Sequence, residues 1–94
     1  LMVKLPEEID HYRSGYICEK ADWYIVKKNV DHVVFDFAVT RFMDSSGIAV
    51  VINALRSMAK IEGKLLLSDL GAQPMKVFRT SGIDKLVEIK EAVS

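Results

Sequence analysis

The sequence predicts a single α/β domain with a mostly parallel sheet of about four strands and three to four helices. Its 94 residues match the length of one domain. Short β-branched or leucine-rich runs alternate with segments of helical apolar spacing, and a helix between successive strands joins them in parallel. We therefore expect one domain over residues 1–94, with the element order β-α-β-α-β-α-β.

The first half of the chain predicts a strand, a helix and a second strand. Residues 1–5 are apolar and extended, and Pro6 ends them. Acidic residues follow within 7–10, where a helix N-terminus favours negative charge. A helix is predicted over 12–28, because one apolar stripe recurs there at helical spacing. Residues 33–37 are β-branched and aromatic, which is typical of a buried strand.

The second half predicts a loop, two helices and two strands. Residues 38–44 show no periodicity and are predicted as a loop. A helix follows this loop and ends at Gly63. The remaining elements are a strand over 65–70, a short helix from Pro74 to Gly82, and a last strand over 86–89.

The composition argues against several classes of protein. Thirteen basic and thirteen acidic residues leave no net charge, which argues against a chain-wide basic surface for nucleic acid. The longest apolar run, 48–52, is far shorter than the roughly 20 residues of a membrane span. The first residues lack the layout of a signal peptide, and the single cysteine, Cys18, cannot form an internal disulfide. We therefore expect a cytoplasmic protein that binds neither nucleic acid nor membranes.

The sequence contains no recognisable catalytic or nucleotide-binding motif. His11 and Cys18 lie seven residues apart on one predicted helix, or about 10 Å by helical rise, which is too far to share a metal ion. Asp36 and Asp69 follow predicted strands, where carboxylates can bind a cation, although capping and loop solvation are the more frequent roles. We expect no enzyme, no cofactor and no metal site, and a small metal- or nucleotide-dependent enzyme built on these two aspartates stays an open alternative.

The most informative segment is Asp44-Ser45-Ser46-Gly47, directly before an apolar helix. Unpaired backbone N–H groups and the helix dipole favour an anion at such a position. A phosphate on Ser45 would add about −1.5 to −2 charges to a neutral domain, and Gly47 would let another surface approach closely. The alternative is ordinary helix capping by these residues, which contributes about 0.5–2 kcal/mol.

The run R-F-M-D-S-S-G-I-A-V-V-I over 41–52 resembles the phosphorylation-site segment of bacterial anti-sigma factor antagonists, which are stand-alone STAS domains. Three further segments agree in register. Residues 5–11 resemble the family's G-E-L-D turn, 30–37 its central strand, and 75–83 its late helix. The resemblance implies a STAS-like fold in which the strand that usually opens the family's sheet is absent.

The resemblance also implies a partner-switching regulator. In the family, the unphosphorylated antagonist binds an anti-sigma factor that is also a serine kinase, and the sigma factor is released. The kinase phosphorylates the serine after the aspartate, here Ser45, which switches binding off, and a PP2C-type phosphatase restores it. Asp44, Ser46 and Gly47 frame this serine, and Asp10 matches the turn aspartate near the same surface.

Two interaction features leave alternatives open. Tyr12, Tyr16 and Trp23 lie outside the core stripe of the first helix. This face, or the uncovered edge of the sheet, is a candidate homodimer surface. The aromatic face also fits a second function, in which the chain is a STAS docking subunit of a scaffold or lipid-transport assembly with no kinase cycle.

Overall fold

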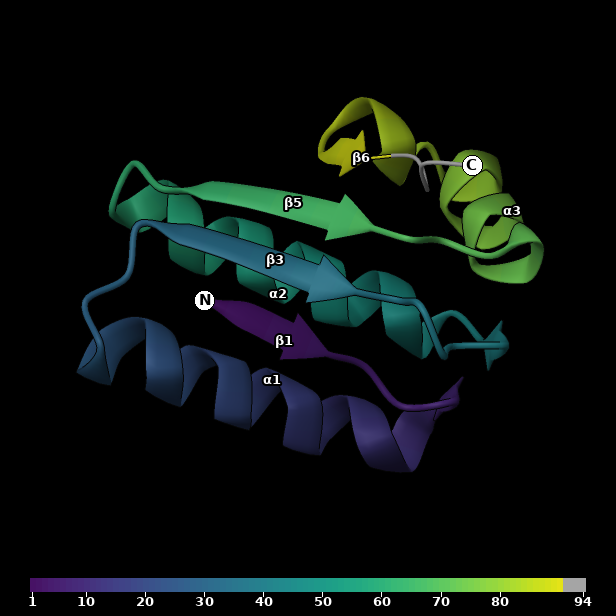
Figure 1. The fold of residues 1–94 in the computed structure, drawn as a ribbon, viewed down its shortest axis with the longest axis horizontal. Coiled ribbons are helices and arrows are strands. Elements are labelled where there is room, and N and C mark those ends of the chain that lie inside the picture. The colour runs from purple at the N-terminus through teal and green to yellow at the C-terminus, as the bar shows by residue number, and fades with distance from the viewer. Residues whose placement is uncertain (91–94) are drawn as a thin grey trace.

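The protein folds around a parallel four-stranded sheet in the order β1-β3-β5-β6 (Figure 1). The computed structural model describes residues 1–90. In chain order the elements are β1 (Met2–Lys4), β2 (Glu8–Ile9), α1 (His11–Lys27), β3 (His32–Asp36), β4 (Phe42–Met43), α2 (Ser46–Lys60), β5 (Lys64–Ser68), α3 (Ala72–Ser81), the 3₁₀ turn η1 (Ile83–Lys85) and β6 (Glu88–Lys90).

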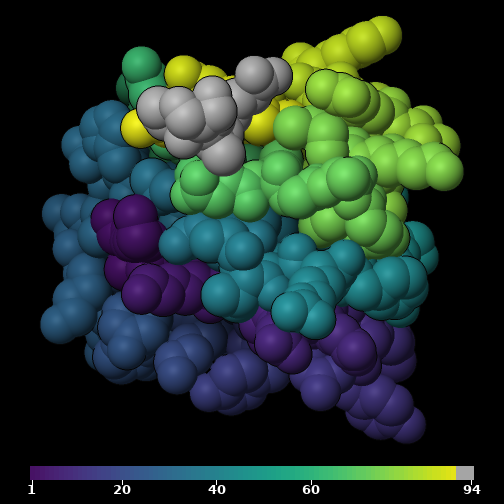
Figure 2. Space-filling model, turned by 45° about the vertical axis from the view of Figure 1, so that its right-hand side comes forward, coloured from purple at the N-terminus to yellow at the C-terminus, as the bar shows by residue number. Residues whose placement is uncertain are grey.

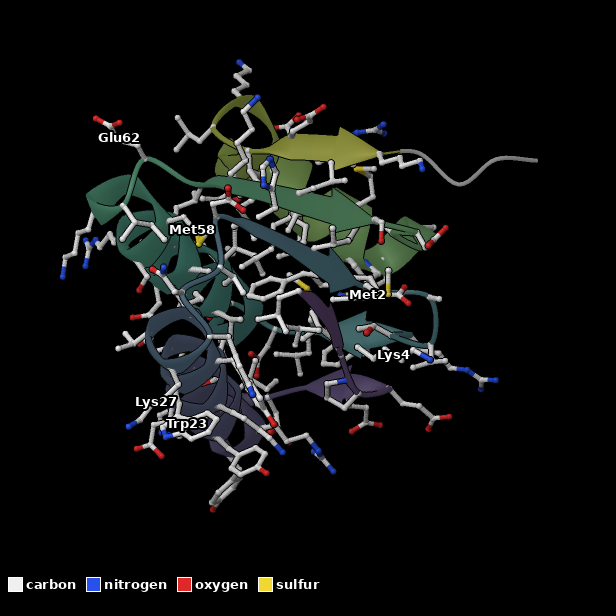
Figure 3. All side chains as sticks on the ribbon, turned by 60° about the vertical axis from the view of Figure 1, so that its left-hand side comes forward. Met2, Lys4, Trp23, Lys27, Met58 and Glu62 are labelled. Carbon is white, nitrogen blue, oxygen red and sulfur yellow. The ribbon has the colours of Figure 1, made fainter. Side chains whose placement is uncertain are left out.

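The predicted fold class is confirmed. Residues 1–90 contain three α-helices, and every neighbouring pair of strands in the main sheet is parallel. The strand order follows the chain in one direction, so right-handed crossovers place successive helices on the same face of the sheet. Accordingly α2 runs behind β3 and β5, and α1 lies along the β1 edge (Figure 1). Met2 and Lys4 point away from these helices (Figure 3).

The core lies between the sheet and its helices. Val33 and Phe35 on β3 are 1% and 0% exposed, and alternate residues of the strand face the other way. Phe37, just after β3, meets Phe78 of α3 edge to face with ring centroids 5.7 Å apart. Each such buried side chain contributes about 1.5–3 kcal/mol. These contacts hold the carboxyl ends of the strands against the helices.

A polar cluster joins α1 to α2 within this apolar layer. The carboxylate of Asp22 accepts hydrogen bonds from Asn53 Nδ2 at 3.1 and 3.2 Å and from Ser57 Oγ at 2.8 Å. The three side chains are half-buried, so their polar atoms gain from being paired. The cluster fixes the position of α1 along α2.

A small second sheet was not predicted. The sequence analysis places a loop over 38–44, whereas Phe42–Met43 pairs in parallel with Glu8–Ile9. Within the acidic run over 7–10, Glu8–Ile9 forms strand β2, and only Asp10 opens helix α1, as its N-cap. Strands of two residues are too short to show alternation in a sequence. Burial stabilises the pairing, because Ile9 and Met43 are only 1% and 0% exposed.

Candidate functional site at the start of helix α2

The β2–β4 sheet brings the predicted site residues together. Ile9 pairs with Met43, and the N–H of Asp44 donates to the carbonyl of Ile9 at 3.1 Å. Asp10 and Asp44 therefore follow directly after two paired strands, and α1 and α2 begin beside each other. Figure 2 shows this edge, where purple N-terminal residues lie against the blue-green residues of β4 and the start of α2. The positive ends of both helix dipoles lie at this edge.

Asp44, and not Ser45, caps helix α2. Ser45 already has helical dihedral angles, φ −61° and ψ −16°. Asp44 Oδ1 accepts the N–H of Ser46 at 2.8 Å, and its carbonyl accepts the N–H of Gly47 at 3.0 Å. The expectation of unpaired N–H groups around Ser45 is therefore wrong at these two positions. The side chain of Ser45 is exposed and makes no capping hydrogen bond, which leaves its hydroxyl available for chemistry.

Asp10 is the cap of helix α1. Its Oδ1 accepts the N–H of Arg13 at 2.9 Å, and its Oδ2 pairs with Arg13 Nη1 at 2.6 Å. The backbone hydrogen bond from Arg13 is the largest cause that holds the pKa of Asp10 below its ordinary value of 3.8. Burial opposes it, and the charge of the Arg13 guanidinium adds to the lowering. The site therefore keeps an ionised carboxylate beside the start of α2 at neutral pH.

Gly47 is buried, and the surface that approaches it belongs to the same chain. A Cβ at position 47 would lie 2.6 Å from Met43 Cε, 2.8 Å from Sδ and 3.3 Å from Cβ. Real Cβ atoms essentially never come within 3.0 Å of another heavy atom, so the end of the Met43 side chain would have to shift. Gly47 thus lets the buried side chain of Met43 pack under the first turn of α2. This packing determines how close the first turn, and with it Ser45, lies to β4.

Gln73 of α3 is a site residue that sequence reasoning missed. Its Oε1 accepts the N–H of Met43, and its Nε2 donates to the carbonyl of Met43, both at 2.9 Å. The side-chain amide therefore bonds the free side of β4 as a neighbouring strand would. The two residues are 30 positions apart, and no local pattern links them, so no sequence signal could have found this contact.

The other candidate residues do not form a second site. Asp36 Oδ1 accepts the N–H of Ala38 at 2.9 Å and so shapes the turn after β3. Asp69 is exposed. Within residues 1–90, no group of three His, Cys, Asp or Glu side chains lies close enough to hold a metal ion. In the same part of the chain, no helix combines the length and apolar character needed to cross a bilayer.

Comparison with known proteins identifies the family. A family model described as the STAS domain matches residues 1–94. The chain belongs to the STAS domain family. This STAS domain is 27% identical over 89 residues to the anti-sigma F factor antagonist of Paenibacillus polymyxa, which is 95% of this chain and 76% of that protein.

Solved structures agree with the family assignment. The anti-sigma factor antagonist SpoIIAA in its unphosphorylated form matches this STAS domain with a TM-score of 0.87 at 27% identity, over 99% of this chain and 79% of that one. The Bacillus cell fate determinant SpoIIAA in the phosphorylated form matches with a TM-score of 0.77 at the same identity, over 99% and 82%. The STAS-like fold implied by the sequence is confirmed.

We predict opposite effects for alanine at two helical glycines. Gly47→Ala should destabilise the STAS domain by about 1–2 kcal/mol, because the new methyl group overpacks against Met43. Gly15→Ala is the matched control, since nothing lies within 4 Å of its added Cβ. This control should gain about 0.5–1 kcal/mol from helix propensity. Urea unfolding measures both, and a stabilised Gly47→Ala variant would contradict the packing described for Met43.

We predict that the Asp10 carboxylate stabilises the fold in a pH-dependent way. Because its pKa is lowered in the folded state, its contribution is complete above 3.8 and is lost as pH falls through the lowered value. Asp10→Asn keeps a capping oxygen but removes the charge. The parent should be more stable than this variant at neutral pH, and the gap should narrow as the pH falls below 3.8 and through the lowered pKa of Asp10.

Urea unfolding of both chains over a pH series is the measurement. Asp31, whose pKa is also lowered by its hydrogen bond to His32, is present in both chains and cancels in the difference. A stability gap that stays constant from neutral to acid pH would show that the Asp10 charge does not contribute.

Proposed function

We propose that this STAS domain is an anti-sigma factor antagonist switched by phosphorylation of Ser45. In its unphosphorylated form it binds an anti-sigma factor with serine kinase activity, and this binding releases the sigma factor. The kinase transfers the γ-phosphate of ATP to Ser45 Oγ, the complex separates, and a PP2C-type phosphatase removes the phosphate. Relatives described as anti-sigma factor antagonists, and the two forms of SpoIIAA, support this proposal.

The observation that carries the proposal is the free Ser45 hydroxyl. The side chain is exposed and makes no capping hydrogen bond, while Asp44 performs the structural role at the start of α2. A kinase can therefore modify Ser45 without removing a contact of the fold. The neighbouring Ser46 is half-buried as the first residue of α2, so of the two serines Ser45 is the better acceptor.

The arrangement of charges explains how one phosphate could end binding. The N–H groups of Ser46 and Gly47 already bond to Asp44, and the guanidinium of Arg13 pairs with Asp10. The phosphate adds about −1.5 to −2 charges beside these groups. The new charge therefore stays at the surface, and a partner that covers it must remove its hydration at high cost.

The proposed partner surface is centred on Ser45 and includes Asp10, Asp44 and Ser46, with Gly47 supporting it from below. Large apolar side chains extend this surface along the preceding segment. Val39 is 58% exposed and Phe42, on β4, is 50% exposed. Exposed apolar groups beside an ionisable switch are typical of a binding patch with a polar rim. We therefore expect both side chains to be covered in the complex.

Incubation with the cognate kinase and ATP, followed by intact mass spectrometry, tests the proposal. The parent should gain one phosphate, and Ser45→Ala should gain none. Ser46→Ala is the matched control, and because it keeps the Ser45 hydroxyl it should still gain one phosphate. In binding measurements with the unphosphorylated proteins, Ser45→Ala should keep the parent affinity, whereas Ser45→Asp should weaken binding at least about tenfold, equivalent to about 1.4 kcal/mol.

Two outcomes would reject the assignment of Ser45. One is phosphate uptake by Ser45→Ala at the parent rate. The other is no uptake by the parent together with stable co-purification in a multi-subunit particle or with a transporter, which would favour the docking-subunit function without a kinase cycle.

A further inference from the structure

Helix α1 carries an unusual outward surface, which we name the outer ridge. Tyr12, Tyr16 and Trp23 are 89%, 63% and 53% exposed. At about 100° per residue these positions lie on one narrow arc, opposite the buried Ile17 and Ala21. The outer ridge consists of Tyr12, Tyr16, Glu19, Lys20, Trp23 and Lys27. A contiguous aromatic surface of this kind is typical of an interaction site.

The residues of the outer ridge are spaced symmetrically along the chain about its middle. Glu19 and Lys20 are adjacent, both exposed, and carry opposite charges at the midpoint of the ridge. Tyr16 and Trp23 lie at equal distances in sequence on either side of this midpoint. At the two ends lie Tyr12 and Lys27, and Trp23 and Lys27 project together from the outer side of α1 (Figure 3).

We propose that two copies of this chain pair through the outer ridge, with their α1 helices antiparallel about a two-fold axis between Glu19 and Lys20. Glu19 then faces the partner's Lys20, and Tyr16 faces the partner's Trp23. Tyr12 lies against the partner's Lys27, as in a cation–π contact. Each pair occurs twice by symmetry. Every ridge residue therefore meets a residue of complementary chemistry.

The charge pattern favours a second copy over a partner of one charge sign. A surface that binds a strongly acidic or basic protein is expected to carry a large excess of one sign, whereas the ridge carries Glu19 against Lys20 and Lys27, and its midpoint carries both signs. Among residues 1–90, β1 is an edge strand of the main sheet, and this edge is a weaker dimer surface. This strand is only three residues long and carries Lys4, and both features discourage pairing at an edge.

The dimer does not depend on the proposed function, because none of its residues belongs to the Ser45 surface. A single pair of helices is an interface below about 1,200 Å², so we expect a weak dimer. Sedimentation velocity of the unphosphorylated chain from about 10 μM to about 1 mM, corresponding to millimolar-to-micromolar affinities, should show the mass rise from monomer toward dimer. Trp23 is the only tryptophan, so its fluorescence should shift to shorter wavelength over the same range.

Charge exchange at the midpoint tests the arrangement. Glu19→Lys and Lys20→Glu each place like charges together twice, and each should weaken the dimer several-fold. The double exchange Glu19→Lys with Lys20→Glu restores both ion pairs and should return the parent association. Arg56→Glu, an exposed charge change on α2, is the control and should leave association unchanged. Circular dichroism confirms that each variant is folded.

Two results would overturn the proposal. The first is a parent chain that stays monomeric over the whole concentration range with unshifted Trp23 fluorescence. The second is a parent dimer that the double exchange fails to restore, which would place the contact elsewhere or in another orientation.

Discussion

The pairing of Ile9 with Met43 is the interaction on which the rest of this structure depends. It joins two segments that each continue into a helix, so it places the first turns of α1 and α2 side by side. The pairing is short, and neighbouring groups reinforce it. Gln73 bonds the other side of Met43, and the absence of a side chain at Gly47 admits the methionine thioether. Ser45 lies directly above this junction.

The division of roles between Asp44 and Ser45 follows from this geometry. Aspartate and serine are about equally good helix caps, so their order in the sequence does not reveal which of them caps. The backbone decides, because Ser45 already has helical dihedral angles. The cap position therefore falls to Asp44. A residue that contributes little to the fold is left at the most exposed point of the helix start, which is where a reversible modification disturbs the fold least.

The main elements could be read from the sequence because their signals are local. The apolar run over 33–37 and the stripe of Ile17, Ala21 and Ile25 each report burial within a few residues. Asp44 and Ser45 stood out for the same reason. The capping pair of Asp10 with Arg13 is also local, because the two residues are three positions apart. This spacing is a signal from which the contact could be predicted.

The contacts that shape the site could not be read in this way. The side chain of Gln73 acts on a residue 30 positions earlier, and Thr40 Oγ1 donates to the carbonyl of Pro6 at 2.7 Å across 34 positions. Such contacts depend on how the crossovers bring distant segments together. Strands as short as β2 and β4 form only because of this tertiary context. The intrinsic strand propensity of their residues therefore does not predict them.

The long span of these contacts has a consequence for synthesis. The platform under Ser45 needs β2 from the beginning of the chain and Gln73 from its last third, so it cannot be complete before the chain has been synthesised beyond Gln73. A ribosome-bound chain that has not yet exposed α3 therefore lacks the Gln73 hydrogen bonds to Met43, and β4 is then held on the β2 side only. A partner that recognises the shape of this platform would therefore bind only complete, folded molecules. It would not bind truncated or misfolded copies.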